Sequence, residues 1–269
     1  MCGIAGFCLN SGSLADPKEL AGSLLTDIEH RGYHATGSAW IDVETKQFRL
    51  LKKDIRAKDF IKISGDTLCS NARTAILHTR WATQGTPKNN SNNHPLMRGE
   101  IALTHNGHIT NDNELFKHLN VKRFGQVDSE AVSALIAFTA KNYHPTEVLG
   151  AIRGTAALAW INALEGADTL HLARVNSSPL WVGQTRSGSI VYASTLEAIR
   201  NGAWWAYDDL AWEHEFQEGE YMRVKSGVIQ EYLAFDRRLN RTFATASWKD
   251  VAIEKAMREQ LIKRSTIRG

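Results

Sequence analysis

The chain opens with Met-Cys-Gly-Ile-Ala-Gly-Phe-Cys-Leu at residues 1–9, followed by Asn-Ser-Gly at residues 10–12. An apolar run that stops at turn-forming residues predicts a buried first strand. Removal of Met1, which a small second residue generally permits, would leave Cys2 with a free α-amino group beside its thiol. Because the amine titrates at about 7.7–8.0 and the thiol at about 8.5, the amine can take the thiol's proton. Cys2 is therefore a candidate nucleophile with its own base, although taken alone it is more typical of a small buried residue.

The composition is that of an ordinary globular protein. Of 269 residues, 43% are apolar and 23% are charged, so the chain can bury a substantial core as one large domain or two small ones. No apolar run reaches the length of a membrane span and no signal-peptide pattern is present. The three cysteines lack the spacing of a metal site or a disulfide framework. We therefore expect a cytoplasmic protein without a membrane interaction.

The order of the expected elements indicates the fold class. Helices are expected from Pro17, with Asp16 as N-cap, and from Asp128 to Thr139. Early strands are expected at residues 38–43, 46–51, 74–78 and 101–105, and residues 155–232 are expected to be mostly β. Residues 34–37 and 85–93 are expected to be loops, and the strand at 101–105 is expected to break at Asn106-Gly107. Strands, then helices, then strands predict an α+β layered fold.

The C-terminal end carries most of the positive charge. Residues 237–269 hold nine Lys/Arg and three Asp/Glu, a surplus of +6, which leaves the first 236 residues at −3 of the total +3. We expect residues 236–269 to be a basic helical extension. Either this extension packs on the domain, or it docks a partner chain or makes a weak contact with nucleic acid or a nucleotide.

Four positions suit attack on the side-chain amide of an amino acid. Cys2 would attack the carboxamide carbon, and Asn106 and Gly107 could donate to the oxyanion through the side-chain NH₂ and the backbone N–H. Arg80 suits a carboxylate through bidentate hydrogen bonding, and Asp128 suits an ammonium group.

Each position also has an ordinary structural interpretation. Asn106-Gly107 is typical of a turn, Arg80 of a surface ion pair and Asp128 of a helix N-cap. The histidines at 78, 94 and 105 fit no standard metal spacing.

The motifs together resemble the class II glutamine amidotransferase (glutaminase) domain of the N-terminal nucleophile hydrolases. The matching segments lie, in the family's order, at residues 1–6, 30–33, 78–83, 94–95, 105–107, 128–130, 173–174 and 178–180. The resemblance covers residues 1–232, and we assign residues 1–235 to the domain. It implies a four-layer αββα sandwich with Cys2 on the edge of a central sheet.

The resemblance also implies roles for individual residues. Cys2 would be the nucleophile, Asn106 and Gly107 would form the oxyanion hole, and Arg80 and Asp128 would hold the α-carboxylate and α-ammonium of glutamine. The family's positions that line the glutamine pocket match Trp81, Thr83 and His94, and its closing loop matches residues 83–94. Glutamine would pass through a γ-glutamyl thioester to glutamate and ammonia, and neither a metal nor an organic cofactor is implied.

Two departures from the family bear on function. Gln84-Gly85 stands where the subfamily that makes glucosamine 6-phosphate commonly has His-Gly, and residues 236–269 are too few for an acceptor domain. The first hypothesis is a glutaminase subunit that supplies ammonia to a synthase or transferase on a separate polypeptide. The alternatives are a self-contained amidohydrolase of a γ-glutamyl compound and a catalytically silent binding module.

Overall fold

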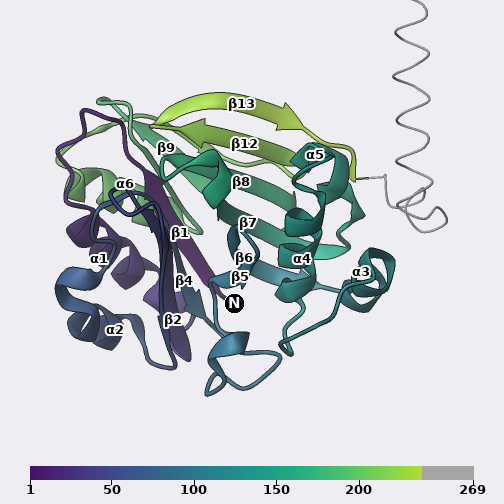
Figure 1. The fold of residues 1–269 in the computed structure, drawn as a ribbon. Coiled ribbons are helices and arrows are strands. Elements are labelled where there is room, and N and C mark those ends of the chain that lie inside the picture. Colours follow the sequence, from purple (N-terminus) through teal and green to yellow (C-terminus); the bar gives the residue numbers. More distant parts are fainter. Residues whose placement is uncertain (238–269) are drawn as a thin grey trace, which may run out of the picture.

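The computed structural model describes residues 1–237, which form two antiparallel sheets with helices on their outer faces (Figure 1). The extension expected at 236–269 lies, from residue 238 on, outside the described residues. None of the helices in the described part is long and apolar enough to cross a membrane.

One sheet contains the N-terminal strand near its middle. Its seven strands are, in spatial order, β11 (Leu210–Glu215), β9 (Trp181–Thr185), β10 (Ile190–Ala193), β1 (Gly3–Cys8), β4 (Ala72–Arg80), β2 (Ala35–Asp42) and β3 (Phe48–Lys53). Every residue of β1 is buried, because the strand has a partner on each side and a packed layer on each face. We expected Cys2 on the edge of a central sheet; it lies just before β1, at the edge formed by the strand ends and not beside an outer strand.

The second sheet contributes the other half of the sandwich. Its six strands are β13 (Val228–Ala234), β12 (Glu220–Lys225), β8 (Thr169–Asn176), β7 (Gly154–Asn162), β6 (Ile101–Ile109) and β5 (Leu96–Arg98). The expected hairpin that turns at Ser226-Gly227 is confirmed as β12 and β13. The strands β5 and β11 were not expected from the sequence.

Helices cover the outer face of each sheet. α1 (Pro17–Ile28), α2 (Ala57–Ser64) and α6 (Leu196–Trp205) lie on the first sheet, and α3 (Asp112–Leu119), α4 (Ser129–Thr139) and α5 (Pro145–Val148) lie on the second (Figure 1). Short 3-10 turns lie at Glu29–Arg31, Gly65–Thr67, Asn90–Asn92, Leu149–Ala151 and Ala163–Glu165. The Asp16 side chain accepts from the backbone N–H groups of Lys18 and Glu19, as expected of the N-cap of α1.

Three apolar clusters separate the four layers. Alternation along β1 sends Ala5 and Phe7 toward α1 and α6, and Ile4 and Cys8 toward the second sheet. A third cluster packs α3, α4 and α5 on the second sheet. The predicted αββα sandwich is confirmed, and its two sheets bring the ends of β1, β4 and β6 together.

Candidate active site

Cys2 lies at the start of β1, against the end of β4. Its Sγ is 3.4 Å from the backbone nitrogen of Trp81, which donates to it, and 3.6 Å from the carbonyl oxygen of Trp81. The carbonyl oxygen of Cys2 accepts from Nε of Arg31 at 3.0 Å. Met1 precedes it and is 76% exposed, so the bond between Met1 and Cys2 is at the surface while the thiol faces inward.

Arg80 ends β4 and is buried, so the interpretation as a surface ion pair is wrong. Its Nη1 donates to Oδ1 of Asn93 at 2.8 Å, and its Nη2 donates to the carbonyl oxygens of Gly85, at 3.0 Å, and of Gln84. The guanidinium therefore joins β4 to the loop of residues 83–94, which was expected to close over the pocket.

Asn106 and Gly107 lie within β6, so the expected strand break between residues 105 and 107 is wrong. The strand continues to Ile109 because Gly107 has a φ of +148°, and a Cβ there would lie 1.9 Å from the carbonyl oxygen of Thr155. Only glycine lets β6 approach β7 this closely. Asn106 is buried, and its Nδ2 has no hydrogen-bond partner within residues 1–237. A buried amide donor without a partner is costly in a folded protein and is typical of a functional position.

Asp128 is the N-cap of α4, as the ordinary interpretation held, and it also contacts β6. Its Oδ1 accepts from the backbone of Ser129 at 2.9 Å, and its Oδ2 accepts from the backbone of Ile109 at 2.6 Å. Nδ1 of His108 lies 3.4 Å from Oδ2. The carboxylate is therefore fixed in position between α4 and β6.

These side chains surround one small hollow. It is lined by Cys2, Arg80, Trp81, Thr83, Gln84, His94, His105, Gly107, Val127, Asp128 and Ser129. Seven of the eight site residues expected from the sequence are among them, and the eighth, Asn106, precedes Gly107 in β6. The hollow offers about 20 Å³ of free space, which is room for a water molecule.

Burial shifts the pKa values of two groups in the site, the Cys2 thiol and the Arg80 guanidinium. Burial raises the pKa of the Cys2 thiol, whereas the hydrogen bond from Trp81 and the positive charge of Arg80 oppose this effect. Burial also lowers the pKa of Arg80, while Cys2 and Asp128 raise it. A base next to the thiol is therefore needed to form the thiolate near neutral pH.

A stack of buried histidines supports the floor of the site. The rings of His78 and His94 are parallel within 22° with centroids 4.2 Å apart. Nε2 of His78 lies 3.1 Å from the carbonyl oxygen of His105, whose Nδ1 lies 2.7 Å from Oγ of Ser129. From the sequence, His94 was expected to line the glutamine pocket, and the spacing of the three histidines fitted no standard metal site. Within residues 1–237 no three His, Cys, Asp or Glu side chains are placed to hold a metal ion.

Burial lowers the pKa of all three histidines, that of His78 to about 3. In the unfolded chain a histidine binds its proton below about 6.5. The unfolded state therefore binds more protons than the native state between these values, and stability falls as the pH falls through this window.

Lowering the pH from 7 to 5 is thus expected to cost about 2 kcal/mol of unfolding free energy through His78 alone. Urea unfolding of the parent and of His78→Gln at both pH values measures this contribution. The loss on acidification should be about 2 kcal/mol smaller in His78→Gln. The exposed His30 offers the matched control His30→Gln, which should behave as the parent does. If the unfolding free energy changes with pH equally in all three proteins, the pKa of His78 is not lowered in the native state.

Sequence reasoning missed two further contacts at the site. Arg31 is bound to the Cys2 carbonyl oxygen and has a buried Nη2 without a hydrogen-bond partner in the described residues. Nδ1 of His34 accepts from the backbone of Ala82 at 3.0 Å. Arg31 belongs to the family motif at residues 30–33, and His34 belongs to the loop expected at residues 34–37. Neither residue was given a role, because nothing local indicates that they reach the site.

Comparison with known proteins finds a family and several relatives that resemble this chain. Residues 78–201 match the model of the glutamine amidotransferase domain family. The chain is 36% identical over 211 residues to a glutamine–fructose-6-phosphate aminotransferase (isomerizing) of Fusobacterium nucleatum, covering 74% of this chain and 32% of that protein. The protein of the same name from Staphylococcus aureus is 29% identical over 208 residues, with 74% and 33% covered. The chain thus spans about a third of the length of these relatives.

Two solved structures share the fold. The glutamine phosphoribosylpyrophosphate amidotransferase of B. subtilis superposes with a TM-score of 0.69 at 19% identity, covering 87% of this chain and 49% of that one. A glutamine aminotransferase class-II domain protein of Silicibacter pomeroyi superposes with a TM-score of 0.56 at 14% identity, covering 87% of this chain and 100% of that one.

Proposed function

Because this chain carries a class II glutamine amidotransferase domain, we propose that it hydrolyses L-glutamine to glutamate and ammonia with Cys2 as the nucleophile. The observation that carries the proposal is the convergence of a thiol, a guanidinium and a carboxylate on one hollow, with the unpartnered amide donor of Asn106 next to Gly107, which lines it. These groups meet four different demands of the same substrate.

The reaction proceeds in two steps after removal of Met1. The Cys2 α-amine takes the thiol's proton, and the thiolate attacks the carboxamide carbon of glutamine. Nδ2 of Asn106 and the N–H of Gly107 donate to the oxyanion. The C–N bond breaks, the leaving nitrogen takes the proton from the α-ammonium, and ammonia departs. Water then attacks the γ-glutamyl thioester, giving glutamate and restoring the thiol.

One of the two groups that hold glutamine, Arg80, contacts the loop of residues 83–94 in the structure. The hollow is too small for an amino acid, so this loop moves away to admit glutamine. That movement releases the N–H groups of Arg80 from the carbonyl oxygens of Gln84 and Gly85, and they bind the α-carboxylate. Asp128 accepts from the α-ammonium. Trp81, Thr83 and His94 line the space around the substrate.

The ammonia is used by an acceptor enzyme on a separate polypeptide. The S. pomeroyi protein, which matches along its entire length, supports the existence of this domain as a chain of its own. The relatives named after glutamine–fructose-6-phosphate aminotransferase are about three times as long as the matched region, and their names describe a transfer to a sugar phosphate. We do not assign that acceptor to this chain.

The test measures glutamate and ammonia released from L-glutamine by protein whose mass shows that Met1 is absent. Equal amounts of both products, with no release from D-glutamine, are expected. Release that is faster from a larger γ-glutamyl compound than from glutamine would support the self-contained amidohydrolase instead. A protein that lacks Met1, releases nothing and is not labelled at Cys2 by a reactive glutamine analogue would contradict the proposal.

A further inference from the structure

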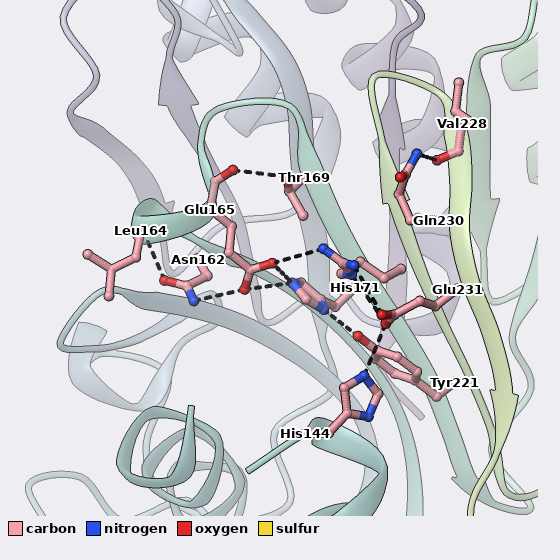
Figure 2. Close-up of polar contacts among 11 residues, drawn as sticks. His144, Asn162, Leu164, Glu165, Thr169, His171, Tyr221, Val228, Gln230 and Glu231 are labelled. Carbon is pink, nitrogen blue, oxygen red and sulfur yellow. Dashed lines mark hydrogen bonds and ion pairs between the residues drawn. The ribbon is translucent and has the colours of Figure 1, made fainter. Parts of the chain in front are cut away.

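A second cavity lies on the outer face of the second sheet, away from Cys2. It has a volume of about 240 Å³, just below the 300–1,000 Å³ typical of sites for drug-sized ligands. One side is apolar and includes Ile101, Ile136 and Val148, whereas the other side carries His144, Asn162, Glu165, His171, Tyr221, Arg223 and Glu231. We call this cavity the outer cleft; Figure 2 shows most of its polar side chains converging from α5, β7, β8, β12 and β13.

Strand register builds the polar side of the outer cleft. Trp160 pairs with His171, His171 with Arg223, and Arg223 with Glu231, so one row crosses four strands. Residues directly opposite each other in antiparallel strands project from the same face of the sheet. A face between a sheet and helices is normally apolar, and replacing buried polar networks by apolar residues is often neutral or stabilising. A row of this kind therefore points to a binding role.

The histidine in this row is fully engaged. The ring of His171 stacks on that of Trp160, with centroids 4.8 Å apart and planes within 10°. Its Nε2 lies 3.1 and 3.2 Å from the carboxylate oxygens of Glu165, and its Nδ1 lies 2.9 Å from the hydroxyl of Tyr221 (Figure 2). Because a carboxylate only accepts, Nε2 carries a hydrogen and donates it to Glu165, and Nδ1 shares a hydrogen bond with the hydroxyl of Tyr221. His171 therefore has no hydrogen-bonding atom left for a ligand.

The outermost carboxylate is also engaged. Glu231 accepts from Nε of Arg223 at 3.2 Å, from Nη2 of Arg223 at 3.0 Å and from Nε2 of His144 at 3.0 Å. The two hydrogen bonds from Arg223 fix its guanidinium against Glu231, and the bond from His144 fixes the carboxylate. Together they use three of the positions at which Glu231 can accept a hydrogen bond.

In the outer cleft, Arg223 and Glu165 carry opposite charges but do not hydrogen-bond to each other. Nη1 of Arg223 is 4.0 Å from Oε2 of Glu165, too far for a hydrogen bond, and both side chains are 32% exposed. In the described part of the chain, Nη1 of Arg223 makes no hydrogen bond. The carboxylate of Glu165 is oriented by Asn162, whose Nδ2 donates to it at 2.9 Å. The outer cleft therefore presents a cationic donor and an anionic acceptor side by side, next to an apolar wall.

We propose that the outer cleft binds a small zwitterion, an α-amino acid with an apolar side chain. Its carboxylate accepts from Nη1 of Arg223, its ammonium group donates to Glu165, and its side chain packs against Ile101, Ile136 and Val148. A net-neutral ligand with adjacent opposite charges matches Arg223 and Glu165, and a ligand of either single charge would leave one partner unsatisfied. The site is distinct from the Cys2 hollow and does not depend on the proposed reaction.

The experiment is isothermal titration calorimetry of the full chain carrying Cys2→Ala, with L-leucine as the probe. Leucinamide, which lacks the carboxylate, and 4-methylpentanoate, which lacks the ammonium group, should each bind about tenfold more weakly or worse. Glu165→Gln and Arg223→Lys should weaken leucine binding by a similar factor. Arg223→Lys keeps a cation beside Glu231 but removes Nη1, and thermal unfolding verifies that each variant is folded.

The exposed ion pair between Arg200 and Glu213 provides the matched control. Glu213→Gln removes a carboxylate from an arginine elsewhere on the surface and should bind leucine as the parent does. Leucine binding that is absent or that survives both outer-cleft substitutions would overturn the proposal. If leucinamide binds as tightly as leucine, the outer cleft does not recognise the carboxylate, and the proposal that it binds a zwitterion is wrong.

Discussion

Replacement of Cys2 by alanine is expected to lower the rate of glutamate release from glutamine by about 10⁵-fold or more, to the background level. The reason is that the thiol forms the bond to the carboxamide carbon, and no other thiol lines the hollow in the described residues. A steady-state assay of glutamate, on protein of verified mass, measures the effect.

The same loss is expected when the thiol is kept and the base is removed. Insertion of lysine between Met1 and Cys2 prevents removal of Met1 and leaves the Cys2 nitrogen as an amide, which cannot take a proton. The control Cys8→Ala removes the thiol at the end of β1, which is buried between the two sheets, and should retain activity. An inserted variant as active as the parent would show that the α-amine is not the base.

Replacement of Asn106 by alanine is expected to lower kcat for glutamine about 10²–10³-fold, which corresponds to about 2.7–4 kcal/mol of transition-state stabilisation. Its Nδ2 is buried and has no partner within residues 1–237, so it can donate to the oxyanion without first breaking another hydrogen bond. KM should change little, because Arg80 and Asp128 hold the amino-acid end of the substrate.

The control for Asn106 is a surface asparagine. Asn201 lies on α6, on the opposite outer layer, and Asn201→Ala should keep the kcat of the parent. Circular dichroism shows whether Asn106→Ala retains the fold, and labelling of Cys2 by a reactive glutamine analogue shows whether substrate still binds. An unchanged kcat, or an effect confined to KM, would contradict the oxyanion role.

Much of the fold and most of the candidate site could be predicted, because short stretches of the sequence carry the information. Asp16 followed by Pro17 indicates a helix start, and Asp128 before an apolar helix indicates an N-cap, and both are confirmed. Cys2, Arg80 and Asp128 were predicted from their chemistry, since each suits a different part of one substrate, whereas Trp81, Thr83 and His94 were predicted from the family resemblance.

The rest depends on contacts that sequence spacing does not reveal. Asn106-Gly107 has the composition of a turn, but the neighbouring strand β7 keeps it extended at a φ that only glycine adopts readily. Similarly, Glu165 and Arg223 are 58 positions apart. The register of β8 and β12 places Arg223 opposite His171, whose ring contacts Glu165 in the turn before β8. Tertiary pairing overrides local propensity in the first case and creates the outer cleft in the second.

The central position of β1 also has a consequence for the order of events during synthesis. β1 pairs with β4 on one side and with β10, near residue 190, on the other. At about 5–20 residues per second, the ribosome needs roughly 10–40 s to reach β10 after it has made β1. During that interval the N-terminus is outside a completed sheet, and an aminopeptidase can reach Met1. Translation itself thus provides a time window in which Met1 can be removed, as the proposed mechanism requires, before the sheet closes around Cys2.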